Sequence, residues 1–358
     1  MKLLLVSLGT LNGAILESVA KTGAFDEIVV ASRNAEHGTR KVNTTRVTAA
    51  IAGHFPAIRF ERFDFNAEDA GKRLKGLAPD IVLTAPSLLP WWAVDNLKDP
   101  RARAAPFASF LACHVAPMLA FRRAWDAAGL GACWVNASYP DVVNAVLART
   151  GAAPECGVGN VEECVPKARI AAAEALGADP AEITVRMVAP HALEYHLYAG
   201  QESRAKPPCL VHATWRGRDV SKEAEAGLYR AMPILYDMDF NLLTSASAAK
   251  LLPALAADRP SLVHVPGPHG RVGGYPVQAA RGRVTLDLAP GWSEADAIAM
   301  NERALAWDGV AGIEGDGTVV FTDATAAAIQ GLLGRPMPKM APHDSAKLAA
   351  DLLAVVRA

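Results

Sequence analysis

Apolar residues in the first part of the chain form short runs separated by longer amphipathic segments. Continuous or nearly continuous apolar runs at 2–8, 27–31, 58–60 and 80–84 are typical of strands covered on both faces by helices. The segments between them show helical spacing of apolar positions, for example at 14–22. This alternation predicts a Rossmann-type, doubly wound parallel sheet.

The pattern changes after the strand predicted at 132–135. A helix beginning at Pro140 follows, and further on the chain alternates between helices and β-rich segments, including a hairpin turn at Gly315-Asp316-Gly317. A chain of 358 residues is too long for one average core. We therefore predict an α/β protein with a dinucleotide-binding domain at 1–140, an α+β substrate domain at 141–358, and an active site between the two.

Composition and charge narrow the class of protein. The chain is 51% hydrophobic and 20% charged, as in ordinary globular proteins. Its net charge is -1 without a block of basic residues, which predicts neither nucleic acid nor membrane as a partner. The first ten residues are interpreted as a buried strand rather than a signal peptide. Five scattered cysteines without a CxxC motif indicate reduced thiols and a cytoplasmic location.

A glycine turn follows the first apolar run. A strict GxGxxG motif would place glycines at 7, 9 and 12, where this chain has Ser7, Gly9 and Asn12. The strand–turn–helix context still predicts a dinucleotide site, because the helix N-terminus offers free N–H groups to the pyrophosphate. The predicted cofactor-binding residues are Gly9, Thr10, Leu11, Asn12 and Gly13, with Thr84, Ala85 and Pro86 beside the nicotinamide half.

The end of the second strand bears on the choice of cofactor. Ser32, Arg33 and Asn34 stand where an acidic residue would bind the ribose 2′-hydroxyl of NAD. A serine and an arginine favour the 2′-phosphate of NADP, so NADP is the first choice and NAD the second. The alternative is that Arg33 and the nearby Arg40 and Lys41 belong to a solvated loop.

The candidate catalytic residues come from the middle of the chain. Arg169 lies within a predicted helix, and His191 follows a strand predicted at 183–188. These side chains suit a site in which Arg169 clamps an anionic substrate and His191 moves a proton. Asn136, at the end of a parallel strand, is expected to orient the substrate or the nicotinamide. The segment 87–106 is expected to be a lid whose arginines close on the substrate, or a mobile loop with solvent-facing charges.

From Asn136 onward the order of these parts resembles the lactate/malate dehydrogenase superfamily. The shared features are a strand ending in Asn136, a helix opened by Pro140, a Gly-x-Gly turn at 157–159, a helix with Arg169, and a strand leading to His191. In that family an acidic residue three positions before the arginine pairs with the histidine. Pro166 occupies the matching position here, with Glu162 or Glu163 as possible substitutes.

The resemblance implies an NAD(P)-dependent oxidoreductase that moves a hydride to or from a small carboxylate-bearing substrate, either a hydroxy/keto or an amino/imino acid. A homodimer is the ordinary assembly for such enzymes. The same stretch is also similar to the NAD-dependent 6-phospho-glycosidases, which implies a lyase or hydrolase as an alternative. The metal-binding cysteine of that group is Gly159 here, so we expect no metal. A non-catalytic dinucleotide-binding protein is the third possibility.

Overall fold

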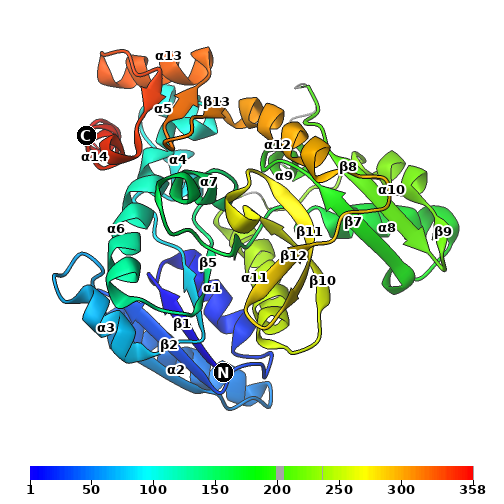
Figure 1. The fold of residues 1–358 in the computed structure, drawn as a ribbon, viewed down its shortest axis with the longest axis horizontal. Coiled ribbons are helices and arrows are strands. Elements are labelled where there is room, and N and C mark those ends of the chain that lie inside the picture. Colours follow the sequence, from blue (N-terminus) through cyan, green and yellow to red (C-terminus); the bar gives the residue numbers. More distant parts are fainter. Residues whose placement is uncertain (199–204, 236, 358) are drawn as a thin grey trace.

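The computed structural model describes residues 1–198, 205–235 and 237–357 (Figure 1). Its N-terminal part is built on one six-stranded parallel sheet in the order β3-β2-β1-β4-β5-β6. The strands are β1 (Lys2–Val6), β2 (Glu27–Ser32), β3 (Ala57–Arg62), β4 (Ile81–Thr84), β5 (Cys133–Asn136) and β6 (Cys156–Gly157). The strand order reverses beside β1, and this is the point at which open α/β sheets bind ligands at their carboxyl edge.

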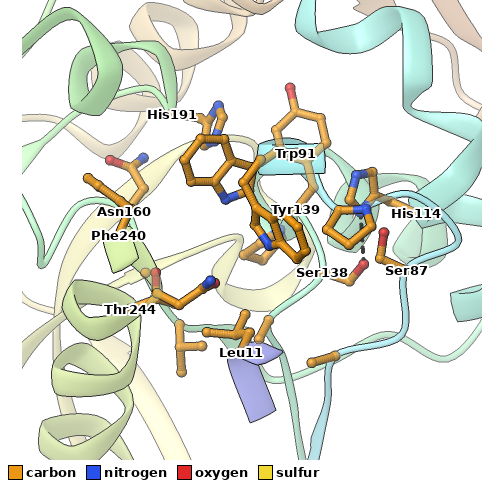
Figure 2. Close-up of a pocket in the computed structure, with 18 of the residues that line it drawn as sticks. Leu11, Ser87, Trp91, His114, Ser138, Tyr139, Asn160, His191, Phe240 and Thr244 are labelled. Carbon is orange, nitrogen blue, oxygen red and sulfur yellow. Dashed lines mark hydrogen bonds between the residues drawn. The ribbon is translucent and has the colours of Figure 1, made fainter. Parts of the chain in front are cut away.

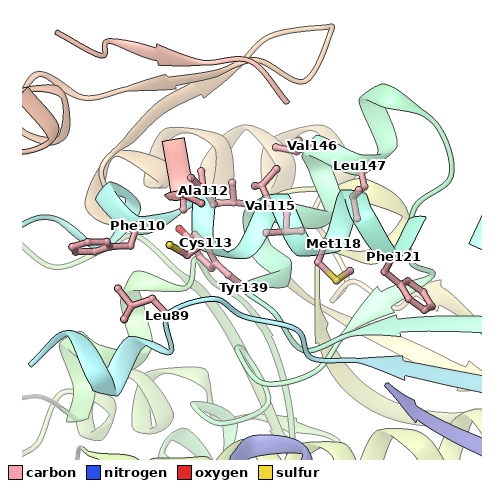
Figure 3. Packing of buried hydrophobic residues seen from close by; sticks show 14 of the residues in the cluster. Leu89, Phe110, Ala112, Cys113, Val115, Met118, Phe121, Tyr139, Val146 and Leu147 are labelled. Atoms are coloured by element: carbon pink, nitrogen blue, oxygen red, sulfur yellow. The ribbon is translucent and has the colours of Figure 1, made fainter. Parts of the chain in front are cut away.

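Helices cover both faces of this sheet. Alternate residues of β1 enter different clusters: Leu4 packs with residues of α3, α6 and α14, whereas Leu3 and Leu5 pack with residues of α1, α2 and α11. Figure 3 shows the first cluster around α6. The helices are α1 (Thr10–Val19), α2 (Ala35–Ile51), α3 (Ala70–Leu77), α6 (Ala112–Ala128), α11 (Asn241–Ala256) and α14 (Ser345–Val356). The predicted doubly wound sheet is confirmed.

The rest of the chain forms an α+β assembly of three small antiparallel sheets. They are β7-β8-β9 (Ile183–Val188, Leu210–Trp215, Arg218–Asp219), β10-β11-β12 (Ser261–Pro266, Gly274–Ala280, Arg283–Leu286) and β13-β14-β15 (Val310–Ile313, Val319–Phe321, Lys339–Met340). The hairpin predicted around Gly315 joins β13 to β14. The intervening helices are α7 (Pro140–Thr150), α8 (Val165–Leu176), α9 (Ala192–Tyr198), α10 (Ser221–Leu228), α12 (Glu294–Asp308) and α13 (Asp323–Leu333).

Later parts of the chain extend the N-terminal sheet and help to cover it. β6 pairs with β5, so the sheet extends to Gly157, beyond the boundary predicted at residue 140. Near the end of the chain, α14 packs on α6. The segment 87–106 contains two short helices, α4 (Trp91–Val94) and α5 (Pro100–Arg103), where a lid-like loop was predicted.

Two further findings bear on the class of protein. Within the described ranges, no helix is long and apolar enough to cross a membrane. The five cysteines are free thiols, as their spacing in the sequence predicted.

Candidate functional site

A cavity of about 180 Å³ lies where the N-terminus of α1 meets the loops after β5, β6 and β7 (Figure 2). Its wall combines backbone from the glycine turn with polar and aromatic side chains from distant parts of the chain. The polar and aromatic side chains include Trp91, Phe107, His114, Ser138, Tyr139, Asp141, Asn160, Glu163, His191, Glu194, Phe240 and Thr244. The predicted proton-transfer residue His191 thus lines the same cavity as the predicted dinucleotide turn.

His191 is held by a buried carboxylate. Its Nδ1 lies 3.0 Å from Oδ1 of Asp308, the last residue of α12, whose side chain is 1% exposed. The Tyr195 hydroxyl donates to the same oxygen over 2.9 Å. Burial alone would lower the pKa of His191, but the charge and hydrogen bond of Asp308 outweigh it and raise the pKa to about 9. With Nδ1 engaged, Nε2 is the nitrogen available to a ligand in the cavity.

Three carboxyl groups face the same cavity. Asp141 accepts a hydrogen bond from Asn160 Nδ2 over 2.9 Å, and burial raises its pKa to about 7. Burial and the neighbouring Glu163 raise the pKa of Glu194 well above its ordinary range. At least one of these carboxyl groups is therefore protonated at neutral pH.

A neutral histidine connects two loops on the opposite side of the cavity. His114 Nδ1 lies 3.1 Å from the Ser138 hydroxyl, which donates to the Pro86 carbonyl over 2.7 Å. The serine proton is committed to Pro86, so His114 donates from Nδ1. Burial, reinforced by the charge of His191, lowers the pKa of His114 to about 4. His114 therefore positions the loop after β4 against the loop after β5.

A second hollow, of about 450 Å³, continues the cavity along the carboxyl ends of β1, β2 and β4. The two share Gly9, Ala85 and Ser87. Of the predicted cofactor residues, those lining one or the other are Gly9, Thr10, Leu11, Asn12, Ser32, Arg33, Ala85 and Pro86. Together the hollows form a groove with the position and extended shape that a dinucleotide requires.

Three predicted cofactor residues have other roles and are not among the residues lining the groove. A Cβ on Gly13 would contact the Lys41 side chain. Asn34 caps α2 by accepting a hydrogen bond from the His37 N–H. Thr84 is fully buried and bonds across the sheet to β5.

The glycine turn fits a pyrophosphate despite its departures from GxGxxG. Ser7 adopts φ 73°, the left-handed conformation for which glycine is usual at such a turn. Asn12 stabilises the turn, since its Nδ2 donates to the carbonyls of Val6 and Ser7. The first turn of α1 contains neither a side-chain cap nor an acidic residue. Its leading N–H groups are thus available to an anion.

Arg169 and Asn136 do not line the cavity. Asn136 is fully buried, and its amide bonds to Asn144 and to the backbone of Ser138. Arg169 is half-buried on α8, and its Nε has no hydrogen-bond partner. These positions do not support the predicted carboxylate clamp, because the described residues that line the cavity include no lysine or arginine.

The arginines of the predicted lid contact their own segment and α13. Arg101 pairs with Asp99 and donates to the Gly331 carbonyl over 2.8 Å, and Arg103 donates to the carbonyls of Leu97 and Lys98. Arg103 lines a neighbouring hollow that shares His191 and Glu194 with the cavity.

Glu162 has a structural role, although its sequence position had suggested a partner for His191. Its carboxylate accepts hydrogen bonds from Lys250 Nζ and, over 2.8 Å, from the backbone N–H of His264. Burial would raise its pKa, but the contacts with His264 and Lys250 lower it to about 2. Because the folded-state pKa lies below the ordinary 4.5, these contacts stabilise the fold above that pH and are lost as the pH falls towards 2.

Replacing Glu162 with Gln should therefore lower the free energy of unfolding by about 3 kcal/mol at pH 7, since His264 and Lys250 lose a buried partner. Urea unfolding at pH 7 and pH 3 measures the loss, which should shrink at the lower pH. The matched control is Glu182→Gln, which removes an exposed carboxylate paired with Arg216 and should change little. Equal effects of the two substitutions would contradict the assigned role.

Comparison with known proteins identifies the fold. No family model and no curated protein sequence matches the chain. Solved structures do match: a lactate dehydrogenase from a Medee basin deep-sea metagenome library has 10% identity and a TM-score of 0.59, covering 86% of this chain and 96% of its own. A malate dehydrogenase from Picrophilus torridus has 11% identity and a TM-score of 0.59, covering 85% and 94%. The lactate dehydrogenase of Cryptosporidium parvum, solved with lactic acid and nicotinamide adenine dinucleotide, has 13% identity and a TM-score of 0.55, covering 86% and 95%.

The chain thus has the fold of the lactate and malate dehydrogenases over about 86% of its length, as the sequence resemblance predicted. Identity of 10–13% carries the likeness no further than the fold. What the protein does must be argued from its own groove and cavity.

Proposed function

We propose that the protein is a dinucleotide-dependent dehydrogenase that oxidises a small alcohol or reduces the corresponding carbonyl. The observation that carries this proposal is the His191–Asp308 pair, which lines the same cavity as the N-terminus of α1. The pair supports the proposal because it would lie beside the nicotinamide end of a dinucleotide bound in the groove, where a proton-transfer group is needed.

The dinucleotide would lie along the groove, with its pyrophosphate at Gly9 and Thr10, and would supply hydride transfer. As the alcohol is oxidised to the carbonyl, the hydrogen of its C–H bond would leave with the bonding electrons to the oxidised dinucleotide, and its O–H proton would go to His191 Nε2. Asp308 stabilises the imidazolium so formed and fixes the ring orientation. In the reverse direction His191 returns that proton to the carbonyl oxygen.

The direct test is a measurement of dinucleotide binding and turnover with the full chain. Quenching of tryptophan fluorescence is expected on addition of NADPH or NADH, because Trp91 and Trp92 line the cavity. Reduction of the oxidised dinucleotide by small alcohols would then be followed by absorbance. A protein that binds neither dinucleotide contradicts the proposal.

We further propose NADP over NAD, because the groove beside β2 contains Arg33 and no acidic residue among its lining side chains. Arg40 and Lys41 pair with Glu36 and Glu17, which leaves Arg33 as the predicted basic residue at this end. Replacing Arg33 with Ala should weaken NADPH binding at least ten-fold by removing a charge-assisted contact, and should leave NADH binding unchanged. Titration of both dinucleotides measures this, with Arg40→Ala as the control. Equal NADPH affinity in wild type and R33A would refute the preference.

A further inference from the structure

Acidic side chains predominate around the cavity. Asp141, Glu163 and Glu194 line it, and the described residues that line it include no lysine or arginine. His191, which also lines it, is paired with a fourth carboxylate, that of Asp308. A substrate carboxylate entering this cavity would meet three carboxyl groups and no clamp.

Two of the three carboxyl groups have oxygens without a hydrogen-bond partner. Glu163 is 5% exposed, and neither of its oxygens receives a hydrogen bond from an N–H or hydroxyl group of the described residues. The Glu194 carboxyl beside it can donate only while protonated. Asp141 is 1% exposed, and its Oδ2 also has no partner. Leaving such oxygens unsatisfied costs free energy, which a ligand bringing N–H donors would recover.

Aromatic rings form much of the remaining wall. Phe107, Tyr139 and His191 lie in mutual contact, with centroids 4.7–4.9 Å apart. Trp91 and Phe240 meet edge to face on another side, and Figure 2 shows Trp91 beside His191 and Tyr139. Aromatic faces next to carboxylates are the usual surroundings of a bound ammonium group, because the ring quadrupole attracts a cation.

We propose that the substrate is a small organic ammonium compound, an amino alcohol or its amino-carbonyl counterpart, whose ammonium group donates hydrogen bonds to Glu163 and Asp141. This assignment rests on the proposed dehydrogenase function. The carbinol carbon lies beside His191, and the alkyl part packs among the aromatic rings. The sequence-based prediction paired a cationic Arg169 with an anionic substrate. In this proposal the charges are reversed: the protein supplies the carboxylates and the substrate supplies the cation.

A divalent metal ion is the other cation that carboxylates attract. Within the described ranges, no three His, Cys, Asp or Glu side chains are arranged to hold one. An organic ammonium group binds through hydrogen bonds and does not require the fixed set of ligands that a metal ion requires. The observations therefore favour the ammonium group.

The experiment uses three alcohols of nearly equal size, differing in one terminal group: 1-amino-2-propanol, 2-butanol and lactate. Calorimetry with the full chain, with and without NADPH, should give at least ten-fold tighter binding of 1-amino-2-propanol than of 2-butanol, and no binding of lactate. Binding the cation should also release protons from Glu194 and Asp141, since a neighbouring positive charge lowers carboxyl pKa values. Repeating the titration in buffers of different ionisation enthalpy measures that release.

Glu163→Gln should abolish the preference for the amino alcohol while leaving NADPH affinity unchanged. Asp141→Asn, which keeps the oxygen that accepts from Asn160, is the second variant should the first fail to fold. The surface substitution Glu182→Gln is the matched control and should behave as wild type.

Several outcomes would overturn the inference. The first two are that lactate or 2-butanol binds as tightly as the amino alcohol, or that none of the three binds. The third is that both cavity variants keep the preference for the amino alcohol. The fourth is that Mn²⁺ stabilises the protein and the amino alcohol does not. Failure of the dehydrogenase proposal gives a different result. If that proposal is wrong, NADPH will not bind or no alcohol will reduce NADP, and this result does not depend on which of the three alcohols binds in the absence of dinucleotide.

Discussion

Replacing His191 with Asn is expected to lower kcat for alcohol oxidation by about 10³-fold, because positioned acid–base groups contribute roughly 10²–10⁴-fold. The side chain lines the cavity and is held through Nδ1 by Asp308, which leaves Nε2 to receive the substrate proton. Asparagine resembles the imidazole in shape but cannot take up that proton. Single-turnover reduction of NADP by the best alcohol found measures the loss.

Dinucleotide affinity should be preserved in the same variant, because His191 lines the cavity and does not line the hollow beside β2 that is proposed for the phosphate-bearing ribose. His343→Asn is a suitable control, since that histidine is exposed on the surface. Unchanged turnover in H191N would remove His191 from the reaction. Parallel losses of turnover and NADPH binding would indicate a structural role.

Replacing Asp308 with Asn should move the titration of His191 by more than two pH units. The aspartate raises the His191 pKa to about 9, against the opposing effect of burial. Without its charge, burial is opposed only by the smaller effects of Asp141 and Glu163, so the pKa should fall well below 9. Oxidation needs neutral His191, so the wild-type rate should rise up to about pH 9, whereas that of D308N should level off before neutrality.

The contribution of the His191–Asp308 pair to stability can be measured without a substrate. The folded-state pKa of His191 lies above its unfolded value, so the pair stabilises the protein fully below pH 6.5 and loses that contribution as the pH rises through about 9. The difference in Tm between wild type and D308N should therefore be largest near pH 6 and shrink above pH 9. NMR titration of the imidazole gives the two pKa values directly, and coincident values would contradict the assigned role of Asp308.

Much of the nucleotide half could be predicted from sequence because its signals are local. A buried strand, a glycine turn and a helix follow one another within 20 residues, so Gly9 and its neighbours could be placed before the fold was known. His191 was selected for a similar reason, as a titratable residue shortly after a strand, and it lines the cavity. The helix-capping role of Asn34 could not be distinguished from ligand binding, since both occur at the carboxyl end of a strand.

The partners of His191 could not be predicted because they are remote in sequence. Asp308 lies 117 residues further along the chain, at the end of a helix whose position depends on tertiary packing. Helical periodicity could not place the side chains of α8. Lys167 is buried and donates to the Leu197 carbonyl, while Arg169 is half-buried. Both faces of α8 pack against other elements, so periodicity alone could not indicate which residue reaches the site.

The return of α14 to the N-terminal sheet has a consequence for biosynthesis. Ala346, at the start of this helix, lines the groove proposed for the dinucleotide, and α14 packs on α6. On the ribosome the first half of the chain emerges with one face of its sheet still incompletely covered. The proposed groove is therefore walled on this side only after α14 has been translated. A nascent chain that stalls before α14 would expose apolar surface of α6 to chaperones.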